Sequence, residues 1–265
     1  IGAGLSSSAA FETLIGTILS GLYNDMSISA IEIAIIGQYA ENVYFGKPCG
    51  LMDQMACATG GLVHIDFKNP SKPVTERVNF DLENYGYSLC ITDTKGSHAD
   101  LTDEYAAVPE EMKQIANYFG KEVLVDVSLN ELLDNVEAMR KVLSDRCILR
   151  AIHFLGENKR VEEEVGALKQ GDIESFLAKI QDSGNSSYKF LQNVYSVKNV
   201  HQQNVSLALA ISETMLGGKG VCRVHGGGFA GTIQAFVKNE DVKSYQASMD
   251  QIFGKGSCSV LKIRK

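Results

Sequence analysis

The stretch IGAGLSSSAA, residues 1–10, is the part of the sequence that most strongly indicates its fold. Behind its glycines and serines comes a run of apolar residues at helical spacing: Leu14, Ile15, Ile18, Leu19 and Leu22. The sequence therefore predicts an amphipathic helix over residues 6–21 with a glycine loop at its N-terminus. The unpaired amide groups and the positive dipole end at such a terminus favour an anion such as phosphate.

The loop consists of Gly2, Ala3, Gly4, Leu5, Ser6, Ser7 and Ser8. Glycine lets the backbone approach a ligand closely, and serine hydroxyls can donate hydrogen bonds or ligate a magnesium ion that bridges phosphates. A simple serine cap after a glycine turn is the structural alternative. The loop has no lysine of the Walker A type, so it is not that motif.

The composition is that of an ordinary globular protein, with 265 residues, 45% hydrophobic and 22% charged. A net charge of −7 and a pI of about 5.3 provide no basic field that would attract nucleic acid or anionic lipid. Six scattered cysteines without a C-x-x-C pair indicate reduced thiols in a cytoplasmic protein, not a zinc site or a disulfide scaffold. No apolar run reaches the roughly 20 residues of a membrane span. We expect no signal peptide, and because the sequence starts without methionine we expect a fragment.

Helical and strand-rich zones predict an α+β fold with helices packed on one face of a mainly antiparallel sheet. Further helices are expected at residues 29–45, 50–61, from Pro109 to Gly120, in a tract ending at Gly171, and at 198–216 and 240–253. Strands are expected at residues 62–67, 74–80, 87–94, 221–225, 231–237 and 257–264.

Two helix starts have side-chain signals. Ser128 and Glu131 form a capping-box pattern, and Asp172 can cap the helix after Gly171.

Residues 1–85 are predicted to be the helical half of a unit whose own strands are largely absent, and residues 86–265 to form a second domain.

Two carboxylates are candidates for chemistry. Asp53 lies in the apolar stretch PCGLMDQ (residues 48–54), where it can orient or accept the proton of an attacking hydroxyl; helix capping is the alternative. Glu41 lies on the preceding helix and can ligate magnesium together with a serine; the alternative is a solvated surface position.

The segment RVHGGGFAGT, residues 223–232, places a glycine cluster between two expected strands. Such a cluster is costly unless the backbone bends sharply or approaches another group closely, although a tight hairpin turn remains the alternative. His225 has no second histidine or cysteine nearby, so a metal ligand is not indicated.

In this order, these stretches resemble the motifs of the GHMP kinase family. GAGLSSSAA (residues 2–10) is similar to the second motif, the phosphate loop, and RVHGGGFAGT is similar to the third. Within the family the galactokinases are the closer match, because GLSSSAAFE (residues 4–12) and CGLMDQ (residues 49–54) are similar to their forms. The resemblance covers essentially the whole chain.

The resemblance implies a two-domain fold with the active site between the domains and a four-stranded antiparallel sheet in the second. It implies transfer of the γ-phosphoryl group of MgATP to the C1 hydroxyl of galactose. The amides of residues 2–8 would hold the β- and γ-phosphates. Ser8, joined by Ser7, and Glu41 would hold Mg²⁺.

The resemblance also implies the sugar site. Asp53 would be the catalytic carboxylate that faces the sugar hydroxyl, Cys49 and Gly50 would line the pocket, and Tyr105 would contact the sugar. His225, Ala230 and Thr232 depart from the usual third motif, as do residues 93–95 from the corresponding galactokinase segment.

Two other functions stay open at this point. The chain is also compatible with a GHMP kinase for another sugar such as N-acetylgalactosamine, or with a non-catalytic sugar or nucleotide sensor. We expect the fragment alone to be inactive, because the first sugar-recognition motif and an assisting arginine of the family do not occur in it. We also expect it to self-associate through the Leu14, Ile18 and Leu22 face.

Overall fold

The computed structural model describes residues 6–46, 49–69, 72–96 and 101–263. The chain divides into two compact units, Ile1–Phe80 with Ile263–Lys265 and Asp81–Lys262, which we call unit 1 and unit 2. Every described helix is too short or too polar to cross a membrane.

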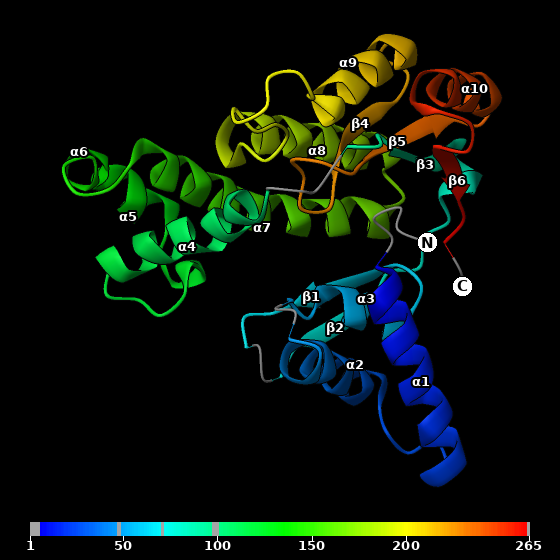
Figure 1. Cartoon of the computed structure of the whole chain (residues 1–265), viewed down its shortest axis with the longest axis horizontal. Coiled ribbons are helices and arrows are strands. Elements are labelled where there is room, and N and C mark those ends of the chain that lie inside the picture. Colours follow the sequence, from blue (N-terminus) through cyan, green and yellow to red (C-terminus); the bar gives the residue numbers. More distant parts are fainter. Residues whose placement is uncertain (1–5, 47–48, 70–71, 97–100, 264–265) are drawn as a thin grey trace. The chain divides into compact units, whose positions relative to one another are not determined.

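In its described part, unit 1 contains α-helices followed by a β-hairpin (Figure 1). The helices are α1 (Ser7–Tyr23), α2 (Ala30–Tyr39), which continues into the π-helical turn η1 (Ala40–Tyr44), and α3 (Met52–Thr59). The antiparallel hairpin pairs β1 (Val63–Asp66) with β2 (Val74–Arg77). These elements confirm the predicted helices and strands of this part of the sequence.

Small residues bring the helices of unit 1 together. The buried positions of α1 are Ala9, Thr13 and Ser20. A Cβ atom added at Gly16 of α1 would lie 2.8 Å from Cγ2 of Ile33 on α2, so the two helices touch through this glycine. α2 begins with a capping box in which Ser29 and Glu32 satisfy each other's backbone amides.

The apolar stripe of α1 does not enter the core of unit 1. Leu14, Ile18 and Leu22 are 57%, 46% and 69% exposed. Exposed apolar positions that form a continuous face usually mark a contact surface. The amphipathic pattern therefore predicted the helix correctly but not what covers its apolar side.

Unit 2 contains a four-stranded antiparallel sheet in the order β4-β5-β3-β6, as the resemblance implied. The strands are β3 (Tyr87–Asp93), β4 (Val221–His225), β5 (Thr232–Lys238) and β6 (Cys258–Leu261). The central strand β3 pairs with both β5 and β6, and β4 joins β5 through the glycine-rich turn.

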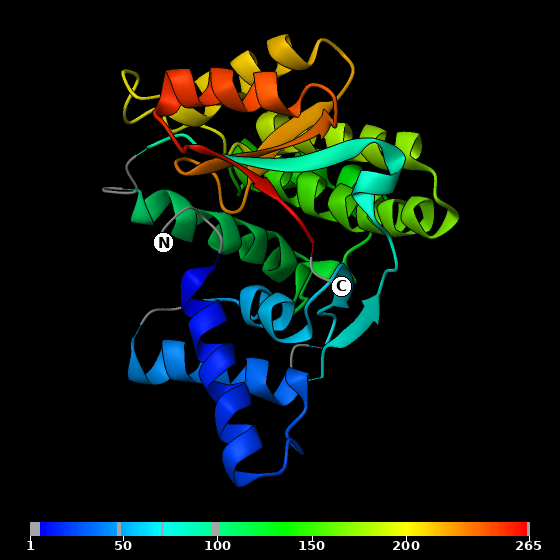
Figure 2. The same cartoon turned by 90° about the vertical axis from the view of Figure 1, so that its right-hand side faces the viewer.

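Helices cover both faces of this sheet, so the expectation of helices on one face is wrong (Figure 2). One face packs on α9 (Asn204–Leu216) and α10 (Val242–Phe253) through Ile233, Ala235 and Val237 of β5. On the other face, Phe236 meets Phe176 of α8 (Ile173–Ser186) with ring centroids 5.5 Å apart. The face of β5 that carries Phe236 also carries the polar residues Thr232, Gln234 and Lys238.

A second core lies away from the sheet, where α4 (Thr102–Tyr118), η3 (Leu124–Asp126), α5 (Leu129–Asp134), α6 (Val136–Met139) and α7 (Asp145–Gln170) pack together. Two short helical segments lie outside this core: η2 (Leu82–Tyr85) contacts β3, and the π-helical η4 (Ser187–Leu191) contacts α7 and α8. Fully buried Ile115, Leu132 and Met139 lie at the centre of this core.

The boundaries of two helices differ from the prediction. Pro109 was expected to start a helix but lies inside α4, which begins at Thr102. A proline there removes one backbone hydrogen bond, and the burial of Ile115 and Ala116 further along α4 stabilises the helix despite that loss. α9 begins at Asn204, six residues later than expected. The caps at Ser128 and Asp172 are confirmed.

Candidate active site

Helix α1 starts immediately after a backbone turn at Ser6. Ser6 has a left-handed conformation (φ 51°, ψ 46°), and its side chain does not cap the helix, so the simple serine cap is not what the structure shows. The first intrahelical bond is donated by the amide of Ala10 to the carbonyl of Ser6. As at every helix N-terminus, no carbonyl of helix α1 accepts from the amides of residues 7–9, and such amides can bind an anion. The predicted ligands Gly2, Ala3, Gly4 and Leu5 lie outside the described residues.

Glu41 is buried, with 4% of its surface exposed, so the solvated alternative is wrong. It lies in the π-helical turn η1, an irregularity that is frequent at functional sites. Its Oε1 accepts a hydrogen bond from Ser8 Oγ at 3.1 Å. Its Oε2 accepts from Gln54 Nε2 at 2.9 Å and from Cys49 Sγ at 3.3 Å. Three segments of unit 1 thus converge on this carboxylate.

The oxygen atoms of Ser8 and Glu41 fit a magnesium ion. Mg²⁺ prefers oxygen ligands at about 2.1 Å and keeps positions for substrate phosphates, so adjacent ligand oxygens lie about 2.9 Å apart. The Ser8 Oγ to Glu41 Oε1 distance of 3.1 Å is close to that value. Among the described residues no group of three or more histidine, cysteine or acidic side chains could form a cage for a metal. These residues therefore suit an ion that is shared with a phosphate ligand.

The segment with Cys49 is tied to helix α2 and turn η1. The amide of Cys49 donates to Asn42 Oδ1 at 2.7 Å, and its carbonyl accepts from Gln38 Nε2 at 3.2 Å. Burial and the bond to Glu41 raise the pKa of the Cys49 thiol. A Cβ atom added at Gly50 would meet nothing within 4 Å, so there is open space beside this residue.

Asp53 lies in the first turn of α3 with its side chain exposed. The N-cap of α3 is Leu51, so Asp53 does not cap the helix. Within the described residues its carboxylate makes no hydrogen bond or ion pair. An exposed carboxylate near the positive end of a helix is able to accept a hydrogen bond from a ligand hydroxyl.

Tyr105 of unit 2 is bound to the glycine-rich turn between β4 and β5. Its hydroxyl donates to the carbonyl of Gly228 at 2.7 Å, and its ring meets Phe229 edge-on at 5.3 Å. Burial raises the pKa of this phenol. Asn193 holds the other side of the turn, because its Nδ2 donates to the carbonyl of Gly227 at 3.2 Å.

Glycine is required at position 228. Its φ is +82°, and an added Cβ atom would lie 1.9 Å from the backbone oxygen of Asn193. That same oxygen accepts the amide of Phe229. The cluster is therefore more than a hairpin turn, since it permits a close approach between two backbone segments. His225 pairs with Gln234 across the strands, with 3.0 Å between Nδ1 and Oε1.

The structure thus joins some of the predicted residues and adds others. Ser8, Glu41 and Cys49 are in contact in unit 1, and Tyr105 contacts the turn in unit 2. Two residues in contact with these sites were not predicted, Gln54 and Asn193. Gln54 could have been singled out, because it is a polar residue directly after Asp53 in an apolar helix. Nothing in the sequence pointed to Asn193.

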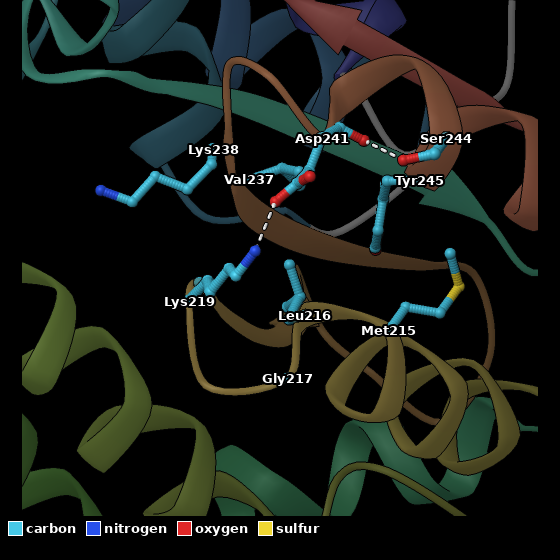
Figure 3. A pocket seen from close by; sticks show the side chains of 10 residues that line it. Met215, Leu216, Gly217, Lys219, Val237, Lys238, Asp241, Ser244 and Tyr245 are labelled. Carbon is cyan, nitrogen blue, oxygen red and sulfur yellow. Dashed lines mark hydrogen bonds and ion pairs between the residues drawn. The ribbon is translucent and has the colours of Figure 1, made fainter.

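Unit 2 also has a small cavity that contains none of the predicted residues (Figure 3). It has a volume of about 170 Å³ and lies between the end of α9, the end of β5 and the start of α10. Lys219 and Asp241 face each other across it at 3.9 Å. Its lining provides no candidate for catalysis.

Comparisons with known proteins relate this chain to the GHMP kinases. Residues 1–61 match the family model described as GHMP kinases N terminal domain. A galactokinase of Glaesserella parasuis serovar 5 (strain SH0165) is 33% identical over 247 residues, which are 91% of this chain and 60% of that protein. A galactokinase of Haemophilus influenzae (strain ATCC 51907 / DSM 11121 / KW20 / Rd) is 30% identical over 250 residues, 92% of this chain and 60% of that protein. The chain thus spans about 60% of the length of the curated relatives it matches.

Solved structures show the fold. Lactococcus lactis galactokinase complexed with galactose superposes with a TM-score of 0.76 at 24% identity, over 99% of this chain and 66% of that one. L. major mevalonate kinase in complex with R-mevalonate gives a TM-score of 0.62 at 16% identity, over 98% and 65%. The chain has the fold of the GHMP kinases, as predicted.

Proposed function

We propose that this chain carries the phosphate-binding and catalytic residues of a galactokinase, which transfers the γ-phosphoryl group of ATP to the C1 hydroxyl of galactose. The observation that carries the proposal is the buried Glu41 carboxylate bonded to Ser8 at the start of α1. Homology to galactokinases over 91% of the chain supports the same reaction.

The phosphate groups of ATP would bind at the N-terminus of α1. The amides of residues 7–9 at the first turn and the helix dipole would attract negative charge there. Ser8 and Glu41 would hold Mg²⁺, which when bound neutralises charge on the transferring phosphate. Phosphoryl transfer needs mainly positioning and charge stabilisation, and a preorganised helix terminus supplies both.

The sugar would bind beside α3. Asp53 would accept a hydrogen bond from the C1 hydroxyl, orient it toward the phosphate and take its proton as the bond forms. Cys49 and Gly50 would line the pocket, since open space adjoins Gly50. Tyr105 would contact the sugar through its phenol oxygen, which can still accept a hydrogen bond while it donates to Gly228.

The test is Asp53→Asn in the complete gene product that contains this chain, assayed by coupled ADP release with galactose. We expect kcat to fall at least about 100-fold, the range of general-base contributions. Asp134→Asn, an exposed aspartate at the end of α5, is the matched control and should keep full activity. Activity of Asp53→Asn within threefold of the parent would overturn the role of Asp53. Rates with galactose and with N-acetylgalactosamine show which sugar is the substrate. A separate assay tests this chain alone, which we expect to consume no ATP with galactose.

We also propose that the chain alone self-associates through the exposed face of α1. Leu14, Ile18 and Leu22 form this face. Light scattering should detect oligomers, and Ile18→Lys should shift them toward monomer. Ile252→Lys is the control, because Ile252 is 47% exposed on α10, as Ile18 is 46% exposed on α1. A monomeric parent at high concentration would exclude the proposal.

A further inference from the structure

Gln54 is a buried amide between two carboxylates. It directly follows Asp53 on α3 and is 1% exposed. Its Nε2 donates to Glu41 Oε2 at 2.9 Å and to Glu12 Oε2 at 3.2 Å. The amide has two N–H bonds, which the two carboxylates accept at the shorter distances, and Nε2 also lies 3.6 Å from Cys49 Sγ. Gln54 therefore connects helix α3 to η1, which carries Glu41, and to α1, which carries Glu12.

The packing around Gln54 gives its side chain little freedom. A Cβ atom added at Gly37 of α2 would lie 3.3 Å from Cβ of Glu12 and 3.5 Å from Cγ of Gln54. α1 and α3 thus both approach α2 at this glycine, one helical turn before Glu41. Met55, the next residue of α3, is fully buried. Three helices hold the amide in place before any ligand arrives.

The two oxygens of Glu41 have different partners. Oε2 is held by Gln54 and by the Cys49 thiol, whereas Oε1 faces Ser8. An amide N–H is a stronger hydrogen-bond donor than a thiol, so Gln54 holds Oε2 more firmly than Cys49 does. With Oε2 held on this side, Oε1 is the oxygen that points to Ser8.

We propose that Gln54 is a positioning residue that holds Glu41 Oε1 toward Ser8 and thereby sets the affinity of the nucleotide site for its divalent cation. This inference rests on the proposed function and deepens it. Gln54 touches neither nucleotide nor sugar in this scheme, and acts through Glu41. Partners that orient a metal ligand typically contribute ten- to hundredfold to metal affinity.

The alternative is a purely structural role in joining three helices. Two substitutions separate the roles in the full gene product. Gln54→Met keeps the length of the side chain and removes both N–H donors. Met55→Leu is the matched control, because it disturbs the adjacent buried position of α3 without touching Glu41. If Gln54→Met does not fold, Gln54→Asn replaces it, since the shorter amide falls short of Glu41 but stays polar.

The direct measurement is Mn²⁺ binding by electron paramagnetic resonance in the presence of adenosine 5′-(β,γ-imido)triphosphate. We expect Gln54→Met to weaken Mn²⁺ binding about tenfold or more, and Met55→Leu to change it less than twofold. In the kinase assay the concentration of Mg²⁺ at half-maximal rate should rise, while kcat at saturating Mg²⁺ changes little. A folded Gln54→Met or Gln54→Asn variant with Mn²⁺ affinity within twofold of the parent overturns the proposal.

Glu41→Gln in the same series tells the two proposals apart. If the parent does not phosphorylate galactose, or if Glu41→Gln binds Mn²⁺ as the parent does, the proposed function fails. If Glu41→Gln loses Mn²⁺ and the Gln54 variants keep it, the proposed function stands and only the role of Gln54 is wrong.

Discussion

The carboxylate cluster of unit 1 and the glycine turn of unit 2 are held in different ways. In unit 1, the side chains of Ser8, Cys49 and Gln54 converge on the side chain of Glu41. In unit 2, the turn is fixed largely through its backbone: the carbonyls of Gly227 and Gly228 and the amide of Phe229 are all bonded. Thr94 adds a bond to the carbonyl of Gly231 at 2.7 Å.

This difference has a physical consequence. A side-chain cluster can orient a charge, and each of its members can be replaced by a residue of similar size. A backbone-held turn depends on which residues leave room for the chain, so an added methyl group can be as damaging as the loss of a bond. We therefore expect the largest effects at the glycine turn.

Gly228→Ala should have the largest effect. Its new Cβ atom would lie 1.9 Å from the Asn193 oxygen in a left-handed backbone conformation, so the two segments must separate. We expect a loss of at least about 3 kcal/mol in the free energy of unfolding, the sum of overpacking and backbone strain. Urea unfolding followed by circular dichroism measures it.

Gly226→Ala is the control for that substitution. Gly226 also has a positive φ, +72°, but an added Cβ atom meets nothing within 4 Å. Gly226→Ala should lower the free energy of unfolding by only about 1–2 kcal/mol, the cost of the backbone strain. Equal losses for the two variants would show that close approach to Asn193 is not what makes the turn sensitive.

Glu41→Ala tests the side-chain cluster and should rank second. It removes the acceptor from Ser8, Cys49 and the buried amide of Gln54, and it leaves a small void. We expect a loss of about 2–3 kcal/mol, because an unpaired buried donor costs about 1–3 kcal/mol. The same urea series measures it, and Glu76→Ala on the exposed hairpin strand β2 should change little. A Glu41→Ala variant as stable as the parent would mean that the cluster does not hold unit 1 together.

The sequence predicted the parts of both regions that depend on neighbouring residues. Apolar spacing predicted α1 and the helix over residues 29–45, and the strand pattern on either side of the glycine cluster corresponds to the observed β4 and β5. Resemblance led to Glu41 and Ser8, and the structure brings them into contact. Such features are local, or carried by a motif, and therefore visible in a sequence.

What could not be predicted depends on residues far apart in the chain. Asn193 lies 35 positions before Gly228, in a segment without any motif, and only the fold brings its carbonyl beside the turn. Pro109 was placed at a helix start by a local rule that burial further along α4 overrides. The second layer of helices over β5 was also missed, because the face with Phe236 carries the polar residues Thr232, Gln234 and Lys238 and so has the pattern of a solvated face.

A group of buried side chains in unit 2 tests whether side-chain contacts are also sensitive to their surroundings there. On α7, burial lowers the pKa of His153 to about 4 and raises that of Glu164 to about 7. His153 pairs with Ser186, with 2.9 Å between Nδ1 and Oγ, and Glu164 Oε1 has no partner among the described residues. Between about pH 4.5 and 6.5 the contributions of the two groups to the free energy of unfolding therefore change in opposite directions.

The signs follow from proton uptake. Neutral His153 stabilises the fold fully above its unfolded pKa near 6.5, and that contribution is lost as pH falls toward 4. Protonated Glu164 stabilises the fold below its unfolded pKa near 4.5, and that contribution is lost as pH rises toward 7. The two slopes oppose each other in the parent, so removing one group should uncover the other.

Glu164→Gln should therefore make stability rise from pH 4.5 to 6.5, and His153→Gln should make it fall, relative to the parent. We expect about 1–2 kcal/mol for each, because both groups retain some contact with solvent that screens the full shift. Urea unfolding at pH 4.5, 5.5 and 6.5 gives the slopes, and other titrating groups cancel in the difference between the two variants. Parallel slopes for the two variants would show that the pKa values of His153 and Glu164 are not shifted in opposite directions.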